Sequence, residues 1–189
     1  IINSVTKVVQ RKNDDHLYLA VIGEFNSGKS TFINALIKDN FLRGLSKPTT
    51  ASATYLVYGE DIQAEVFLPN GKKDIVRKKD EPINLKWLKN HVNVSFKNFI
   101  DLITSENEDD TKNEILSEIK KVIISHPAIF LKSEKVVIID TPGSNATLIE
   151  GQKHNEVTRE VIEKHADAAI ILIPSHQQIS DSFANFLNT

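Results

Sequence analysis

The sequence predicts an α/β domain in which helices cover both faces of a mixed, mostly parallel β-sheet. Short apolar runs, which are typical of buried strands, alternate with segments whose apolar residues recur at helical spacing. The runs at 17–22, 136–140 and 168–173 are followed by helical patterns at 32–37, 155–165 and 179–187. A glycine-rich loop separates the first run from the first of these helices, which adds a strand–loop–helix unit to the pattern.

The composition is that of a globular chain, with 40% hydrophobic and 25% charged residues among 189. The net charge of −2 provides no general basic field, so we expect no nucleic-acid partner. Cysteine is absent, which excludes disulfide frameworks and thiolate zinc sites and suits the cytoplasm. Methionine is also absent, and we expect the sequence to be part of a longer protein. Its longest apolar run, 168–173, is too short to span a bilayer.

The first sixteen residues predict an amphipathic helix, because their apolar residues recur at helical spacing as Ile1, Ile2, Val5, Val8 and Val9. Farther along, 51–58 and 62–68 are expected to be strands, and the turn Pro69-Asn70-Gly71 leads into a third strand through Val76.

The middle of the chain is less regular. Between Pro82 and Asn113 we expect one helix, with apolar residues from Phe96 to Ile103 and a cap at Ser95, and otherwise an insertion or loop. Val122 to Ile124 indicates a strand edge.

Residues 23–30 read Gly-Glu-Phe-Asn-Ser-Gly-Lys-Ser and match the pattern of a phosphate-binding loop. Glycines allow backbone N–H groups to curl around a polyphosphate, and the following helix adds its positive N-terminal end. In such a loop Lys29 reaches the β- and γ-phosphate oxygens and Ser30 binds Mg²⁺. The position between a predicted strand and a predicted helix makes a chance glycine turn a poor alternative.

Asp140-Thr141-Pro142-Gly143 is the second expected element of the site. A carboxylate at the end of a buried strand can hold Mg²⁺ through water beside a phosphate-binding loop. The backbone N–H of Gly143 can approach a γ-phosphate. Taken alone, Asp140 could equally cap a turn. In a doubly wound sheet, however, both motifs lie at the carboxyl ends of strands, where ligands bind.

A loop that senses the γ-phosphate is expected at 41–50, with Thr50 as a second hydroxyl on Mg²⁺ and Thr49 as the alternative. Adjacent threonines are also common where a strand begins. Arg43 and Lys47 flank this loop, and either could stabilise charge in a transition state, although an exposed loop cation is usually only solvated.

Three stretches together resemble the GTPase domain of the bacterial dynamin-like proteins. They are GEFNSGKSTFINALI, then KPTTASATYLVYG, then VVIIDTPG followed by a helix and AAIILI. The resemblance assigns 17–189 to that GTPase domain, incomplete at its C-terminal end, and 1–16 to a fragment of a helical neck or stalk. The resemblance also implies that the loop contacts phosphate, that Thr50 belongs to switch I, and that Asp140 and Gly143 belong to switch II. The expected loop contacts are Gly23, Glu24, Phe25, Asn26, Ser27, Gly28, Lys29, Ser30 and Thr31.

The resemblance implies Mg²⁺-dependent GTP hydrolysis, with GTP or GDP bound, coupled to assembly and membrane fusion or fission. It further implies a homo- or hetero-oligomer of dynamin-like subunits, and a parent protein that is cytoplasmic and peripherally associated with membrane lipid. The catalytic residues are expected to be Lys29, Thr50, Asn26 and Gly143, and the metal ligands Ser30, Thr50 and Asp140.

Two departures from the pattern leave alternatives open. The family's guanine-reading motif is expected beyond Thr189, so guanine preference is not visible. Position 144 is Ser rather than the glutamine that orients water in small GTPases, so the backbone near Glu24 and Phe25, the Asn26 amide and Thr50 are the expected hosts of the attacking water. A P-loop ATPase or kinase, or a GTP-gated scaffold with little turnover, remains the alternative.

A basic cluster surrounds the predicted hairpin. A charged edge strand that resists aggregation explains it better than a surface for phosphate-rich partners. Its members are Lys72, Lys73, Arg77, Lys78 and Lys79.

Overall fold

The computed structural model describes residues 14–24, 26–42, 53–68, 70–85, 92–104, 119–143, 155–175 and 178–188. Residues 1–13 of the expected N-terminal helix therefore lie outside the described residues, and residues 14–16 are not helical. Phe25, Thr49 and Thr50 and the flanking cations Arg43 and Lys47 also lie outside the described residues.

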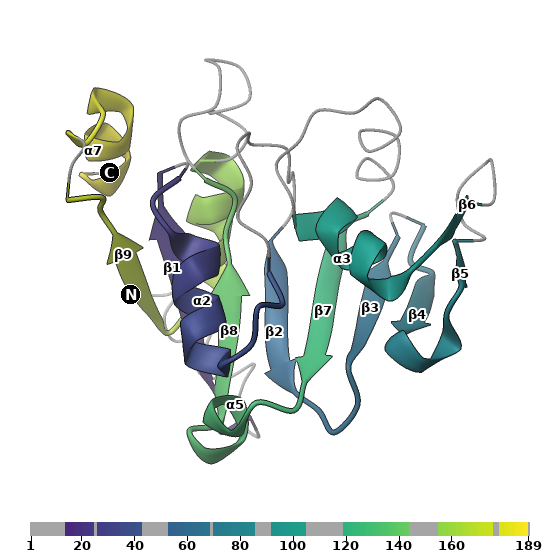
Figure 1. Cartoon of the computed structure of the whole chain (residues 1–189). Helices are drawn as coiled ribbons and strands as arrows, with labels where there is room; N and C mark the ends of the chain where they lie inside the picture. Colours follow the sequence, from purple (N-terminus) through teal and green to yellow (C-terminus); the bar gives the residue numbers. More distant parts are fainter. Residues whose placement is uncertain are drawn as a thin grey trace.

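A seven-stranded mixed sheet runs through the centre of the domain (Figure 1). Its order is β4 (Lys73–Arg77), β3 (Gln63–Phe67), β7 (Lys121–His126), β2 (Thr54–Tyr58), β8 (Val136–Asp140), β1 (Leu17–Gly23) and β9 (Ala168–Leu172). Strand β1 pairs in parallel with both β8 and β9. Strand β2 is antiparallel to β8 but parallel to β7, and β3 is antiparallel to both β7 and β4. The parallel group β8–β1–β9 thus brings three carboxyl ends to one edge.

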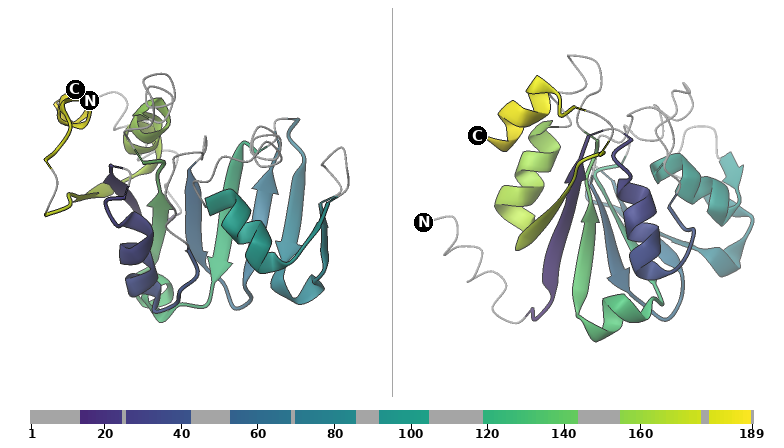
Figure 2. Two further views of the ribbon diagram at one scale, coloured as in Figure 1. Left: turned by 45° about the horizontal axis from the view of Figure 1, so that its top comes forward. Right: turned by 60° about the vertical axis from the view of Figure 1, so that its left-hand side comes forward.

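Helices lie on both faces of the sheet, as the sequence predicts (Figure 2). On one face lie α2 (Lys29–Ile37), α3 (Phe96–Thr104) and α5 (Ile129–Ser133). The other face carries a helix at 155–160, which continues as the π-wound turn η2 (Val161–His165), and α7 (Asp181–Leu187).

Two apolar cores result from this layering. The larger lies between the sheet and the α2, α3 and α5 layer, and it includes Val21, Ile33 and Ile138. The smaller lies beneath η2 and α7, where Ile22 and Ile139 meet Phe183. Consecutive β1 residues therefore enter opposite cores, which explains why that strand reads as an uninterrupted apolar run.

Most of the elements expected from periodicity are confirmed. Helix α2 buries Ile33 and Ile37, and the Ser95 hydroxyl accepts the backbone N–H of Asn98 at the start of α3. The 62–76 hairpin forms as β3 and β4, which pair antiparallel.

Three elements were not predicted, and one is larger than expected. Within the stretch expected to be insertion or loop, β5 (Ile83–Leu85) and β6 (Val92–Val94) form a two-stranded antiparallel sheet. Helix α5 is only five residues long, too short to show a periodic pattern. The expected strand edge at Val122 to Ile124 is a six-residue strand inside the sheet, β7.

Candidate functional site

The phosphate-loop sequence folds into a tight loop between β1 and α2. Asn26 and Gly28 have positive φ angles of 57° and 89°, and the backbone N–H of Ser27 donates to the Glu24 carbonyl at 3.1 Å. Left-handed backbone is inexpensive for glycine and tolerable for asparagine, so these residue types suit the two reversals. The chain then enters α2 at Lys29, whose first turn carries Ser30 and Thr31.

Gly23 is required by close packing rather than by its φ angle. A Cβ atom there would lie 2.3 Å from the Ser27 hydroxyl oxygen and 2.7 Å from the carbonyl oxygen of Leu172. The second contact is with the backbone of β9, which cannot rotate away. The loop therefore begins where the end of β1 packs closely against the end of β9.

Lys29 is buried at 7% exposure, and its side chain folds back over the loop. The Nζ atom donates to the carbonyl oxygens of Gly23 and Glu24 at 3.1 and 3.0 Å. These two bonds hold a full positive charge at the loop, where a polyphosphate would need it. A phosphate oxygen could replace the neutral carbonyls as a stronger, charge-assisted acceptor.

Asp140 lies at the end of β8, in register with Val21 of β1. Its Oδ1 atom is buried and has no hydrogen-bond partner. Burial raises the pKa of this carboxyl to about 6, against an opposing effect from the charge of Lys29. A buried, incompletely paired carboxylate is costly unless a cation lies beside it. The arrangement therefore suits a hard cation, for which carboxylate oxygen is a preferred ligand.

Thr141 connects the two motifs directly. Its hydroxyl is buried and donates to the carbonyl of Val21 at 2.8 Å, two residues before the phosphate loop begins. The sequence placed this threonine in a turn and indicated no contact with β1. Threonine after a strand has no distinctive pattern, so only the pairing of β1 with β8 reveals the contact.

Glu24 makes a second contact that the sequence did not suggest. Its carboxylate accepts the backbone N–H of Ser180 at 3.0 Å, just before α7. The Ser180 hydroxyl in turn accepts the backbone N–H of Phe183 at 3.2 Å and caps that helix. A capping serine at 180 is a recognisable sequence signal, but its link to the phosphate loop is not.

The described part of the expected site comes together at the carboxyl ends of β1 and β8. Gly143 is buried just beyond Thr141, and Ser30 is half-buried on the first turn of α2. Phe25 and Thr50 lie outside the described residues, so their expected roles stay predictions.

The basic cluster at the hairpin is extensively paired with acidic residues. Lys73 forms an ion pair with Glu65 at 2.8 Å, Arg77 with Asp80 at 3.7 Å, and Lys79 with Asp61 at 3.7 Å. Strand β4 lies at the edge of the sheet, which favours the interpretation of a charged, protected edge.

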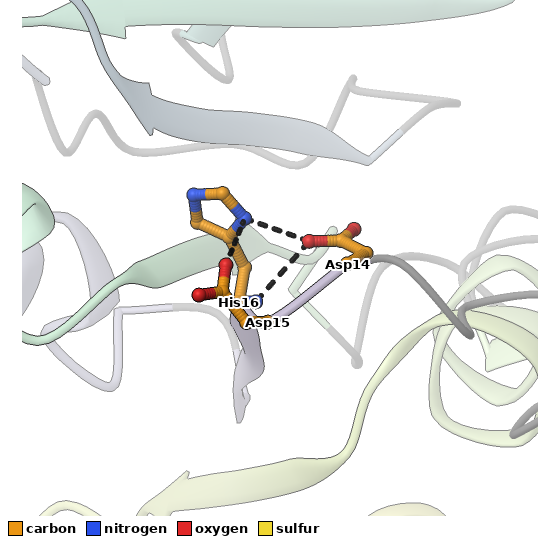
Figure 3. A group of neighbouring side chains, drawn as sticks. All are labelled: Asp14, Asp15 and His16. Atoms are coloured by element: carbon orange, nitrogen blue, oxygen red, sulfur yellow. Dashed lines mark hydrogen bonds and ion pairs between the residues drawn. The ribbon is translucent and has the colours of Figure 1, made fainter.

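A group of possible metal ligands lies at the opposite end of β1 (Figure 3). Polar atoms of Asp14, Asp15 and His16 fall within 4.8 Å of one another, and all three residues are exposed. Asp14 accepts from the Tyr18 hydroxyl at 2.7 Å and contacts His16 at 2.7 Å, while Asp15 pairs with Lys135. The carboxylates are thus engaged within the protein, and the group ties the start of β1 to the start of β8.

A hollow of about 810 Å³ lies on the face that carries α2 and α3, away from the phosphate loop. Its apolar surface comes from Phe41, Phe96 and Ile100, with Lys78, Lys97 and Glu81 among the charged residues. None of the loop residues that the structure describes lines it, nor does Asp140, so the hollow is not the site expected from the sequence.

The fold and the loop together define the class of protein. A glycine loop between a buried strand and a helix, with an aspartate at the end of the adjacent parallel strand, is the arrangement of a P-loop nucleotide-binding domain. The model of the Dynamin family matches residues 19–189, and the chain belongs to this family. Its fold is the corresponding GTPase domain, of which the chain covers part.

Individual relatives agree with the family. The chain is 28% identical over 197 residues to dynamin-like protein 1 of Campylobacter jejuni, which covers 96% of this chain and 26% of that protein. A 65-residue stretch is 38% identical to a probable chloroplastic transmembrane GTPase of FZO-like type from Arabidopsis thaliana, and it covers 34% of this chain and 6% of that protein.

A solved structure of an oligomerised bacterial dynamin pair superposes with a TM-score of 0.58 at 25% identity, covering 98% of this chain and 32% of that one. That pair is described as a mechanism for the long-range sensing and tethering of membranes. The chain thus spans about a quarter to a third of these bacterial relatives. Within the described residues, no helix is both long and apolar enough to cross a membrane.

Proposed function

We propose that this domain binds GTP with Mg²⁺ and hydrolyses it. The observation that carries the proposal is the pairing of β1 with β8, which places the buried ammonium of Lys29 near the buried carboxylate of Asp140 at the mouth of the phosphate loop. The Lys29 ammonium is suited to phosphate oxygens, and the Asp140 carboxylate is suited to the accompanying metal ion. Membership of the dynamin family supports guanine as the base.

The metal-binding residues in this proposal are Ser30, Asp140 and Thr50. Asp140 fits the role because its buried Oδ1 has no protein partner, so a cation or its water shell would satisfy an otherwise costly group. Ser30 stands on the first turn of α2, where a hydroxyl can face the same ion as the phosphates. When bound, Mg²⁺ supplies charge neutralisation across the β- and γ-phosphates.

The phosphates are held by the loop from Gly23 to Thr31. Lys29 exchanges its two carbonyl acceptors for phosphate oxygens and there neutralises the charge that develops during transfer. The backbone N–H of Gly143 contacts the γ-phosphate and so couples its presence to the segment after β8. The attacking water is oriented by the Asn26 amide, Thr50 and the backbone at Glu24 and Phe25.

We further propose that hydrolysis is coupled to assembly of dynamin-like subunits and to membrane remodelling by the whole protein. The family match and the superposition on an oligomerised bacterial dynamin pair support this extension. Contact with lipid is then made by other parts of the protein, which is peripheral to the membrane on its cytoplasmic side. This part of the proposal concerns a protein of which the chain is one section.

Phosphate release by the full-length protein, with GTP and ATP compared in parallel across a range of protein concentrations, tests the proposal. Lys29→Ala is the blank, because it removes the buried ammonium while leaving the exposed surface unchanged. We expect GTP turnover that disappears in this variant and that rises per molecule with protein concentration. A concentration-independent rate would separate hydrolysis from assembly and contradict the coupling.

Two other outcomes would overturn the proposed activity. A preference for ATP would indicate a P-loop ATPase or kinase, although ATPases commonly place glutamate after the strand aspartate, where this chain has Thr141. Tight GTP binding without turnover would indicate a GTP-gated scaffold.

A further inference from the structure

Glu24 belongs to the phosphate loop, but its side chain contacts a segment 156 residues later in the chain. Its carboxylate accepts the Ser180 backbone N–H at 3.0 Å, and the residue is only 5% exposed. A buried carboxylate that accepts a backbone N–H is a strong and directional contact rather than a solvated charge. We propose that Glu24 is a positioning residue that couples occupancy of the phosphate loop to the position of helix α7. The inference rests on the proposed function, since it takes GTP as the ligand of the loop.

The contact leads from the loop into the smaller core without interruption. The backbone N–H of Ser180 donates to the Glu24 carboxylate, and the Ser180 hydroxyl accepts the backbone N–H of Phe183. Phe183 is 1% exposed and packs with Ala20, Ile22 and Val161. Its ring also stacks on Phe186, with centroids 6.0 Å apart. A displacement of Glu24 must therefore move the start of α7 or break a buried hydrogen bond, which is costly.

The backbone of Glu24 also contacts Lys29, the residue proposed to bind phosphate oxygens. Its backbone carbonyl accepts from Lys29 Nζ at 3.0 Å, as does the Gly23 carbonyl at 3.1 Å. If Lys29 turns to phosphate oxygens, both carbonyls lose this donor. Loss of this donor would free the backbone of Glu24 to shift, and its carboxylate would carry that shift to Ser180. Coupling between distant segments requires an element of this kind, whose state depends on the ligand.

A second contact lies at the β9 end of this region. The carbonyl oxygen of Leu172, at the end of β9, lies so close to Gly23 that a Cβ atom there would be 2.7 Å from it. Residues 23 and 24 thus contact both ends of the connection that runs from β9 to α7. Movement at the start of the loop is transmitted to both ends of this connection.

Hydrogen exchange of the full-length protein, with and without Mg²⁺ and a non-hydrolysable GTP analogue, tests the coupling. In the wild type we expect the analogue to change the exchange of α7 amides. In Glu24→Ala we expect these amides to exchange about five- to tenfold faster without nucleotide and to lose their response to the analogue. Glu24→Gln should restore most of the response, because its amide oxygen can still accept from Ser180. Glu160→Ala is the control, since it removes an exposed carboxylate paired with Lys164.

A second pair of variants probes the contact from its donor side. Ser180 has a φ of −67°, which proline adopts readily, so Ser180→Pro removes the donor N–H at a compatible backbone position. Ser180→Ala removes the same hydroxyl cap but keeps the N–H group. We expect the analogue response to be retained in Ser180→Ala and lost in Ser180→Pro.

Different results would overturn the proposed nucleotide binding and the proposed coupling to α7. If the analogue does not protect the loop amides from Asn26 to Ile33 in the wild type, the proposed nucleotide binding is wrong and the coupling falls with it. If the loop is protected but α7 responds in Glu24→Ala as it does in the wild type, only the coupling is overturned.

Discussion

The hydroxyl of Thr141 donates a hydrogen bond to the carbonyl of Val21 at 2.8 Å, in the buried space between β8 and β1. Through this bond the residue after the candidate metal ligand Asp140 is fixed to the strand that leads into the phosphate loop. The hydrogen bond between Thr141 and Val21 therefore helps to set the distance between Lys29 and Asp140, although neither of these residues takes part in it.

Replacing Thr141 with valine should reduce the free energy of unfolding by about 1–2 kcal/mol, because the Val21 carbonyl loses a buried donor without a change in side-chain volume. It should also weaken Mg²⁺-dependent nucleotide binding by loosening Asp140. Urea denaturation and nucleotide titration measure the two effects. Thr141→Ser keeps the hydroxyl and should retain most of both properties. A valine variant as stable as the wild type would show that the bond contributes nothing.

Asp140 should make the nucleotide-free protein less stable as pH rises. The carboxyl has a pKa of about 6 in the folded protein and an ordinary value of 3.8, so the folded state binds the proton more tightly. The associated stability is present below about pH 4 and is lost as pH rises through about 6. At 1.36 kcal/mol per pH unit, the loss is at most about 3 kcal/mol.

Asp140→Asn should remove that loss and make the nucleotide-free protein more stable than the wild type near neutral pH. It should also abolish Mg²⁺-dependent turnover, because a neutral amide lacks the negative charge with which a carboxylate holds a hard cation. Denaturant unfolding at about pH 5 and about pH 8, with phosphate release alongside, measures both effects. A variant less stable than the wild type at about pH 8 would contradict the proposed cost of the buried charge.

Removing the charge of Lys29 should raise the pKa of Asp140 further, since the ammonium of Lys29 now lowers it. In Lys29→Ala, the pH at which the Asp140 carboxyl titrates by carbon NMR should therefore move upward. Lys29→Arg retains the positive charge and should leave that midpoint nearer to the wild-type value. A downward shift in Lys29→Ala would mean that the two groups do not interact as the structure indicates.

The two loop glycines should respond differently to alanine. Gly28→Ala places a Cβ atom on a residue whose φ is 89°, but that atom would have no neighbour within 4 Å. We therefore expect the free energy of unfolding to fall by about 1–2 kcal/mol. Gly23→Ala places its Cβ atom 2.7 Å from the Leu172 carbonyl, and the backbone of β1 or β9 must move. We therefore expect Gly23→Ala to be the more destabilising variant in thermal or urea unfolding. Equal costs would show that β9 yields easily at this point.

The phosphate loop was predictable because its chemistry depends on adjacent residues. Positive φ at Gly28, an ammonium one residue later and a hydroxyl after that all follow from a short, contiguous pattern. The buried strands were predictable for a similar reason, since residues such as Ala20, Val21 and Ile22 must be apolar to enter both cores. Helix α5 and the β5–β6 pair escaped prediction because they are too short to show a period.

By itself, the sequence determined which residues form the phosphate loop, where the aspartate strand ends, and that a helix follows each. The tertiary structure alone decided that Asp140 lies beside Val21, that Thr141 bonds across to β1, and that Glu24 holds the start of α7. Local patterns record the conformational preferences of neighbouring residues. Contacts between residues separated by more than a hundred positions depend instead on strand order, which the pairing of β8, β1 and β9 establishes only when the cores are packed.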